Sequence, residues 1–374
     1  MQRVMFQLKT SINVLVLLFL FDQILFTSAV SAASISSTLP VTLLQAAHAP
    51  RALYQSALLT EKATHSVLLS VTRAGTRLVA AGERGIILIS DDQGLSWQQS
   101  VVPTSVNITK LYFVDAMQGW ALGHMGVVLH TMDGGDTWSK QLDGIELAKL
   151  AVEAVRDTED DRIRKKAINL LKDGPDKPFF DITMDAQGRG FVVGAFNLIF
   201  RTEDGGKQWH YWSPQLENPL DLHLYSIAQV GKRYLIVGEQ GLIMRSTLKG
   251  DRFEAVSSPY GGSWFGFLIS RQGTLLLYGL RGNAYVSSDQ GDTWHAVSVS
   301  SDVSFSSATE LEDGRIILVN QAGELFVSHD QGQHFSTIPR GLRAPLTAVV
   351  QSESGNLVLT SLLGIKVLSD FDSP

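Results

Sequence analysis

Short apolar runs separated by turn residues recur along residues 66–370 with a nearly constant period. Each unit has an apolar run, a Gly-x-x-Gly turn or a softened form of it, four mostly apolar residues, and then Ser or Thr. The final hydroxyl residues lie 41, 71, 44, 41, 41 and 41 residues apart, and they are Ser90, Thr131, Thr202, Ser246, Ser287, Ser328 and Ser369. A period of about 40 residues with four short strands per unit predicts an all-β fold, a seven-bladed β-propeller.

A second signature, Asp-x-Gly-x-x-Trp, follows the hydroxyl residue in most units, and we refer to it as the Asp box. Its carboxylate can accept backbone N–H groups within the turn, and its indole can pack against the next sheet. Because these residues recur from unit to unit, we predict structural roles for Asp92, Asp133, Asp204, Asp289, Asp330, Trp97, Trp138, Trp209 and Trp294. A degenerate copy in the fourth unit keeps only Ser246, Gly250 and Phe253.

The seventh unit stops near Ser369, before any outer strand, while a spare apolar segment precedes the first unit. An unpaired sheet edge exposes hydrogen-bonding groups, so a propeller is expected to close its ring. We therefore predict that residues 50–60 supply the outer strand of the last blade, and that residues 50–374 form one propeller domain.

A charged stretch with helical periodicity, residues 142–178, interrupts the repeat between the second and third units. Apolar positions at helical spacing predict a helical hairpin, with Asp157 and Thr158 as caps of its second helix and Gly174-Pro175 as its end. A flexible solvated loop is the alternative. The insertion leaves an outer strand and returns to an inner strand, so it is expected on the rim that carries the Gly-x-x-Gly turns. We call this end of the propeller the GxxG rim and predict that it is the working face.

The first 32 residues have the features of an export signal. Arg3 and Lys9 precede an apolar run over residues 12–21, and small residues lead to an expected cleavage site after Ala32. Residues 33–49 are then a linker, and the mature chain is expected to be periplasmic. An uncleaved membrane anchor is the alternative. The chain has no cysteine, so neither disulfide bonds nor lipoprotein anchoring is expected.

The charge and the scattered polar residues give little support for catalysis or for binding of a metal, cofactor or nucleic acid. The net charge is −6 with acids and bases mixed, so no nucleic acid partner is expected. The nine histidines are scattered without metal-ligand spacing, and no glycine-rich loop leads from a strand into a helix, so we predict no metal and no cofactor. A sialidase or another glycoside hydrolase remains the enzymatic alternative, although the early Arg-Ile-Pro signature is missing and Ile338-Pro339-Arg340 has the wrong order.

The pairs of residues between the repeated glycines vary chemically from blade to blade, as suits a protein-binding surface. We predict partner binding through this ring of turns, with aromatic contact area added by a nearby loop. The candidates are Glu83, Arg84, His124, Met125, Phe196, Glu239, Arg281, Gln321, Tyr260 and Trp264. No catalytic residue is predicted, and a soluble ligand-binding sensor is a further alternative.

Residues 119–138, which read GWALGHMGVVLHTMDGGDTW, resemble the repeat of the photosystem II stability and assembly factor family, and residues 258–266 are similar to another stretch of that family. The Asp box itself is also found in neuraminidases, sortilin-type receptors and some glycoside hydrolases. The resemblance extends over about residues 66–370 and implies an exported scaffold that holds or assembles membrane proteins, transporter subunits included. Nothing in the sequence points to photosynthesis, so a non-photosynthetic bacterial member is expected. The helical insertion departs from the family pattern.

Overall fold

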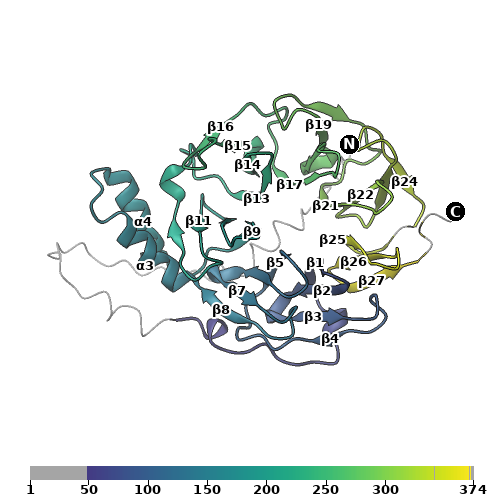
Figure 1. Cartoon of the computed structure of the whole chain (residues 1–374), viewed down its shortest axis with the longest axis horizontal. Helices are drawn as coiled ribbons and strands as arrows, with labels where there is room; N and C mark the ends of the chain where they lie inside the picture. Colours follow the sequence, from purple (N-terminus) through teal and green to yellow (C-terminus); the bar gives the residue numbers. More distant parts are fainter. Residues whose placement is uncertain (1–48, 341, 370, 372–374) are drawn as a thin grey trace, which may run out of the picture. The chain divides into compact units, whose positions relative to one another are not determined.

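The computed structural model describes residues 49–340, 342–369 and 371. The predicted export signal and nearly all of the predicted linker lie outside the described residues. Within them, the strands form seven antiparallel sheets that follow one another around a ring (Figure 1). The predicted seven-bladed propeller is therefore confirmed.

Each of the first four blades is a meander of four strands, numbered from the axis outward. The strands of blades 1 and 2 are β1 (Leu68–Ala74), β2 (Arg77–Gly82), β3 (Ile87–Ser90), β4 (Gln98–Gln99), β5 (Ile108–Phe113), β6 (Gly119–Gly123), β7 (Val128–Thr131) and β8 (Ser139–Leu142). Those of blades 3 and 4 are β9 (Phe179–Met184), β10 (Gly190–Gly194), β11 (Ile199–Thr202), β12 (His210–Tyr211), β13 (Leu224–Val230), β14 (Arg233–Gly238), β15 (Ile243–Ser246) and β16 (Phe253–Ala255).

Blades 5 and 6 follow the same pattern, and blade 7 has three strands among the described residues. The strands are β17 (Trp264–Ile269), β18 (Leu275–Gly279), β19 (Ala284–Ser287), β20 (His295–Val297), β21 (Phe305–Glu310), β22 (Ile316–Asn320), β23 (Leu325–Ser328), β24 (Ser336–Ile338), β25 (Leu346–Gln351), β26 (Leu357–Ser361) and β27 (Gly364–Leu368). One-turn 3-10 helices occupy four of the Gly-x-x-Gly turns, namely η3 (Glu83–Gly85), η4 (His124–Gly126), η6 (Glu239–Gly241) and η7 (Leu280–Gly282).

The hydrophobic core lies between neighbouring blades, not within any single one. The second strands of blades 2, 3, 5, 6 and 7 are buried along their whole length, because their two faces contact different neighbours. For example, Val79 of blade 1 and Ala121 of blade 2 belong to one cluster. Strands that are buried on both faces read as continuous apolar runs, which explains why the repeat is visible in the sequence.

Every inner strand carries a β-bulge at its second residue, opposite the end of the second strand. Glycine ends that strand in five blades because the chain passes close by: a Cβ on Gly82 would lie 2.0 Å from the Val67 carbonyl oxygen. The bulged residues, which are the second of each inner strand, therefore have no partner on the second strand. They are Leu69, Thr109, Phe180, Tyr225, Phe265, Ser306 and Thr347.

The prediction that residues 50–60 complete the last blade is wrong. This segment forms the short helix η1 (Arg51–Leu53) and no strand, and its amide at Ala57 donates to the Val102 carbonyl in the connection between blades 1 and 2. Blade 7 instead closes the ring by packing its face on blade 1, where Val358 shares a cluster with Leu78. Face-to-face burial of apolar side chains thus replaces the expected strand exchange.

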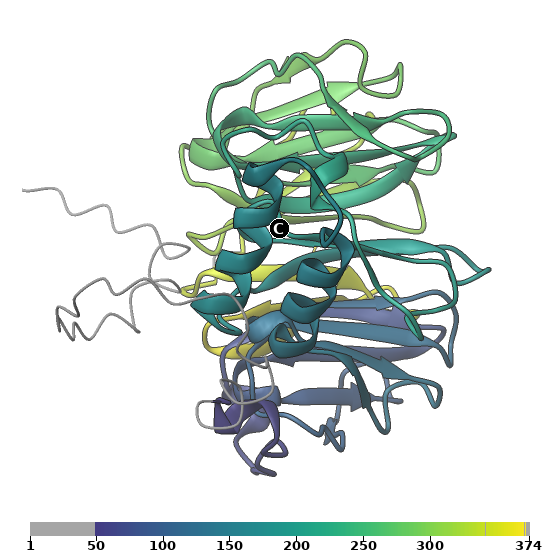
Figure 2. The same cartoon turned by 90° about the vertical axis from the view of Figure 1, so that its left-hand side faces the viewer.

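The predicted helical hairpin is present as α3 (Gly144–Ala154) and α4 (Asp161–Asp173), which lie side by side at the edge of the ring (Figure 2). Asp143 caps α3 by accepting from the amides of residues 145 and 146. Asp160 caps α4, not Asp157 or Thr158 as predicted, because its extended backbone lets its carboxylate accept from the first amides of the helix. Gly174 ends α4 as expected. No helix in the described part of the chain is long and apolar enough to cross a bilayer.

The hairpin begins directly against the Gly-x-x-Gly turn of blade 2. A Cβ on Gly126 would lie 2.2 Å from Cδ2 of Leu147, and one on Gly144 would lie 2.7 Å from the carbonyl oxygen of Met125. The insertion therefore sits on the GxxG rim. Lys140 ties this corner together, because its Nζ contacts the Asp143 carboxylate at 2.7 Å and the Leu53 carbonyl at 3.1 Å.

The segment before the first blade is expected to stabilise the ring through Leu53, which is fully buried against blades 1 and 2. Replacing Leu53 by Ala should lower the free energy of unfolding by about 2–5 kcal/mol, measured by urea denaturation. The matched substitution Leu59→Ala removes the same atoms from a side chain that is 66% exposed and should leave the stability nearly unchanged. Equal effects of the two substitutions would contradict the packing role of Leu53.

Candidate functional site

The seven turns of the GxxG rim are fixed by one repeated hydrogen bond. In each blade, the amide of the second turn residue donates to the carbonyl of the residue just before the inner strand, at 2.9–3.2 Å. The donors are Glu83, His124, Ala195, Glu239, Leu280, Gln321 and Leu362, and the acceptors are Val67, Asn107, Pro178, His223, Ser263, Ser304 and Pro345. The turns are thus held at the axial end of every blade.

Four of these acceptor residues also hold the turn of the preceding blade. Their side chains accept the amide of its third residue, which has a left-handed backbone conformation. The pairs are Arg84 with Asn107, Phe196 with His223, Gln240 with Ser263, and Arg281 with Ser304. These four turn residues therefore project from a backbone that two blades position together.

Aromatic side chains gather at the axial end of blades 3 to 5, and we call this group the axial cluster. It consists of Phe180, Phe196, His223, Tyr225 and Phe265. Ring centroids of Phe180 and Tyr225 are 5.4 Å apart, those of Tyr225 and Phe265 are 5.6 Å apart, and those of Phe196 and His223 are 4.6 Å apart. All five side chains keep some exposure, and Phe196 is 56% exposed. The cluster offers apolar area at the rim.

Burial keeps the axial cluster uncharged. Desolvation, helped by the negative charge of Glu239, raises the pKa of Tyr225 to about 12. Desolvation also lowers the pKa of His223, against the opposing effect of Glu239. The neutral imidazole can then accept the amide of Phe196 through Nδ1, at 3.0 Å. Below the cluster, Asp181 is buried and contacts Nζ of Lys110 at 3.0 Å and Oγ of Ser226 at 2.6 Å, which ties blades 2, 3 and 4 together.

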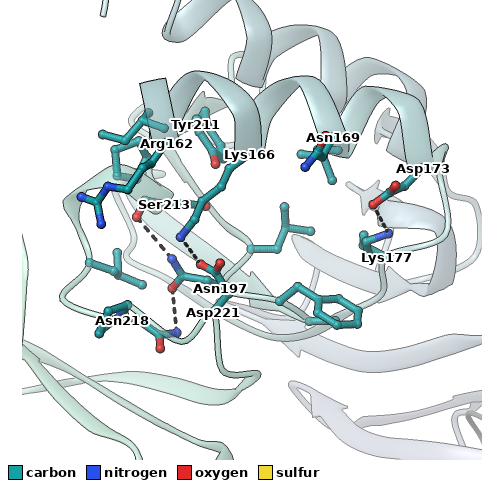
Figure 3. Close-up of a pocket in the computed structure, with 18 of the residues that line it drawn as sticks. Arg162, Lys166, Asn169, Asp173, Lys177, Asn197, Tyr211, Ser213, Asn218 and Asp221 are labelled. Carbon is teal, nitrogen blue, oxygen red and sulfur yellow. Dashed lines mark hydrogen bonds and ion pairs between the residues drawn. The ribbon is translucent and has the colours of Figure 1, made fainter. Parts of the chain in front are cut away.

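A cleft of about 660 Å³ separates α4 from the rim of blade 3 and its connection to blade 4 (Figure 3). Its apolar lining includes Ile163 and Leu170 from α4, Leu198 from blade 3, and Leu216 from the connection. Phe196 lines the cleft as well as the axial cluster. One apolar surface therefore runs from the axis, across the turn of blade 3, into the cleft.

Polar contacts span the cleft and brace its walls. Nζ of Lys166 on α4 contacts Asp221 at 2.6 Å, and Nδ2 of Asn218 donates to Oδ1 of Asn197 at 3.0 Å. Asn197 takes the place of the second glycine of the turn and, like Phe196, has a positive φ. Two successive non-glycine residues in this region are uncommon, and strained backbone of this kind concentrates at functional sites. Nζ of Lys177 lies 5.5 Å from the Phe196 ring centroid.

The predicted binding residues divide into exposed and structural groups. Arg84, Arg281 and Phe196 are exposed on the GxxG rim, while His124, Met125, Gln321 and Tyr260 are half-buried there. The half-buried side chains of Glu83 and Glu239 accept from the amides of residues 67 and 223, so they brace the turns.

The prediction that Trp264 adds exposed contact area is wrong. It is fully buried as the first residue of β17, because that position points between blades, and its Nε1 donates to Oγ of Ser258 at 3.0 Å.

The Asp boxes lie at the opposite end of the blades, and their carboxylates are occupied by their own turns. Asp92 accepts from the Ser96 amide at 2.8 Å and from the hydroxyls of Ser90 at 2.8 Å and Ser96 at 2.5 Å. The boxes centred on Asp133, Asp204, Asp289 and Asp330 accept from equivalent groups. Trp138 and Trp209 are buried, while Trp97 and Trp294 are half-buried.

The described residues contain no group of three or more His, Asp or Glu side chains arranged to hold a metal ion.

Comparison with known proteins identifies the family. The model of the family described as photosynthesis system II assembly factor YCF48 matches residues 89–163 and 160–341, which is more than half of the chain. The chain belongs to the YCF48 family. The predicted resemblance is therefore confirmed.

Curated relatives of the YCF48 family match only part of the chain. A photosystem II assembly protein Ycf48 from Synechococcus sp. (strain JA-3-3Ab) is 27% identical over 189 residues, which cover 44% of this chain and 55% of the relative. A photosystem II assembly lipoprotein Ycf48 from Synechococcus sp. (strain CC9902) is 34% identical over 73 residues, or 20% of this chain and 22% of the relative. The chain spans at most about half the length of the curated relatives it matches.

Solved structures share the fold at low identity. A structure described as YCF48 bound to D1 peptide has a TM-score of 0.60 and 16% identity, covering 84% of this chain and 97% of that one. YCF48 from Cyanidioschyzon merolae gives 0.60 and 14%, over 83% of this chain and 97% of that one. A virginiamycin B lyase from Staphylococcus aureus gives 0.62 and 12%, over 83% and 96%, so this fold also occurs in enzymes.

Sequence reasoning missed the axial cluster and the cleft of this family member. Phe180, Tyr225 and Phe265 each occupy the second position of an inner strand, and aligning the seven units on that position would have revealed the aromatic run. The cleft gave no comparable signal, because Lys166, Asn197 and Asp221 come together only when the hairpin folds back over blade 3.

The boxes should make stability depend on pH. Hydrogen bonds from the Ser96 hydroxyl and amide lower the pKa of Asp92 from 3.8 to about 2, and similar bonds lower that of Asp289. A carboxyl with a depressed folded pKa stabilises above its unfolded pKa, so this contribution should be lost as pH falls from about 4 to about 2. Urea denaturation at several pH values should show a shallower acid slope for Asp92→Asn.

Asp302→Asn, which removes an exposed carboxylate outside the boxes, is the control and should keep the wild-type slope. Parallel slopes for Asp92→Asn and the wild type would show that the bonds to Asp92 do not lower its pKa.

Proposed function

We propose that the chain is an exported, non-enzymatic scaffold that holds a segment of a membrane protein of the cell envelope, such as a transporter subunit, during assembly. The observation that carries this proposal is the apolar surface that runs from the axial cluster through Phe196 into the α4 cleft. Membership of the YCF48 family supports it, as does the relative solved as YCF48 bound to D1 peptide. The D1 peptide is the partner of that relative, so we describe the partner of this chain only by the chemistry of the surface that would bind it.

The shape and charge of this surface suit an extended segment. Apolar side chains of the segment would be buried against Phe196, Tyr225 and Leu198, while exposed Arg84 and Arg281 would contact carboxylates. The backbone under these residues is already fixed by hydrogen bonds between blades. Binding to such a preorganised rim costs little ordering of the propeller, which favours affinity from modest contact area.

The contacts of the acids in the cleft support a binding role over glycoside hydrolysis. That reaction needs two carboxylates about 5–10 Å apart across the bond to be cleaved. The acids that line the α4 cleft already have partners: Asp173 contacts Lys177, Asp221 contacts Lys166, and Glu217 accepts from the amide of residue 255. A scaffold needs none of these groups to be free, so the binding role fits the cleft better.

Site-specific photo-cross-linking in intact cells tests this role. A photoreactive residue in place of Phe196 should yield a membrane-protein adduct, identified by mass spectrometry. The same residue in place of Leu95, which is 83% exposed in the first Asp box, is the matched control and should yield none of that adduct. The double change Arg84→Glu and Arg281→Glu should reduce the adduct from position 196 several-fold without lowering the melting temperature.

Two results would sink the proposal. One is the absence of any membrane-protein adduct from position 196, and the other is the same adduct with the same yield from position 95. Release of sugar from sialosides or β-glucans by the purified wild-type chain, lost when a cleft carboxylate is removed, would replace the scaffold by an enzyme.

A further inference from the structure

Blade 4 carries the degenerate Asp box, and its replacements change the charge of the opposite rim. Leu248 stands where the other described boxes have aspartate, and Arg252 stands where Asp92 of blade 1 finds its serine partner. Lys249 lies between them. Ser246, which would bond the missing carboxylate, donates to the carbonyl of residue 247 instead. The turn has therefore lost an acid and gained two cations.

In blade 1, the arginine at the start of the second strand contacts two carboxylates. The guanidinium of Arg77, the first residue of β2, contacts both Asp91 carboxylate oxygens, at 2.7 and 3.0 Å. A third contact, at 3.1 Å, reaches Asp136 in the box of the next blade. Two carboxylates thus surround this guanidinium.

Arg233 occupies the same position in blade 4, as the first residue of β14, but it forms neither of the two carboxylate contacts. Thr247 stands where blade 1 has Asp91. Asp292, the counterpart of Asp136, contacts Arg245 at 2.5 Å instead. Within the described residues, no ion pair is recorded for Arg233. Equivalent arginines therefore occur in two blades: Arg77 contacts two carboxylates, and Arg233 contacts none.

Arg233, Lys249 and Arg252 line one cavity of about 650 Å³ on the Asp-box rim. The acids in this lining are Asp251, Glu254 and Asp292. Asp292 already pairs with Arg245, and Asp251 accepts from the Thr247 hydroxyl at 2.5 Å. An adjoining cavity shares Arg233 and includes Asp289, whose carboxylate is occupied by its own box. The cavity thus combines two acids, Glu254 and Asp251, with three cations that form no ion pair in the described part of the chain, and the charge of Asp251 acts on Lys249 and Arg252. Together with the Arg245–Asp292 pair, the lining carries one more cation than acids.

We propose that this cavity binds a phosphate group, with the Arg233 guanidinium in the role of its main ligand and Lys249 and Arg252 completing the charge. A guanidinium matches two oxygens of a phosphate in the way that Arg77 matches the two oxygens of Asp91. A phosphate monoester, which carries close to two negative charges, would supply with one group the contacts that two carboxylates make to Arg77. The ligand class is therefore a phosphate ester, either soluble or as a lipid headgroup.

Calorimetric titration of the mature chain with inorganic phosphate and with glycerol phosphate, at constant ionic strength set with chloride, tests the site. The wild type should show saturable binding, and Arg233→Gln should weaken it by about tenfold or more. Arg252→Gln, at an exposed position, should also weaken it and guards against a folding defect at the half-buried Arg233. Lys207→Gln, an exposed lysine in the intact third box, is the matched control and should bind like the wild type.

Sedimentation with vesicles separates the two sources of phosphate. Co-sedimentation with phosphatidic acid vesicles but not with phosphatidylcholine vesicles, lost in Arg233→Gln, assigns a lipid headgroup, whereas binding to glycerol phosphate alone assigns a soluble ester. Absence of saturable binding to any of these probes would overturn the proposal. Equal loss of binding in Lys207→Gln would also overturn it, because the effect would then reflect general surface charge. These results do not depend on the GxxG rim.

Discussion

A blade of this propeller cannot bury its own apolar faces, and the rest of the structure depends on that constraint. The second strands are covered on both sides only because another blade lies against each face, so the ring must close to be stable. Closure needs matching faces and not an exchanged strand, which is why Val358 of blade 7 packs on Leu78 of blade 1. Within a blade, the close approach of the inner strand to the end of the second strand in turn requires glycine at positions such as Gly82.

The GxxG rim inherits its rigidity from the same packing. A residue such as His223 starts the inner strand of one blade and accepts the turn amide of the previous one, so neighbouring turns cannot move independently. The hairpin is seated with equal precision, because Gly126 and Gly144 leave no room between α3 and the turn of blade 2. The cleft beside α4 is braced in turn by the contact between Lys166 and Asp221.

The sequence predicts the parts of this structure that repeat and misses those that depend on how the repeats meet. The period, the Asp boxes and the helical spacing over residues 142–178 are local signals, and they led to the correct fold and insertion. The prediction of a closing strand was wrong because the ring is closed by the apolar faces of the sheets and not by pairing at a sheet edge. The prediction that Trp264 is exposed was wrong for a related reason. An aromatic residue shortly after Gly-Gly suggests a loop, but β17 already begins at Trp264. The axial cluster depends on bulges at the same position in three neighbouring blades, which no single repeat reveals.

Three departures from the repeat fall in neighbouring parts of the ring. The insertion enters before blade 3, Asn197 replaces the second glycine of that blade's turn, and blade 4 loses its box aspartate. The ring tolerates such losses only where the packing between neighbouring blades is kept. In blade 4, Phe253 still fills the tryptophan position as a fully buried side chain. Blades 3 and 4 thus keep their buried apolar residues while their turns change on both rims. The buried apolar residues hold neighbouring blades together, so substitutions in the turns can alter the surface of either rim without opening the ring.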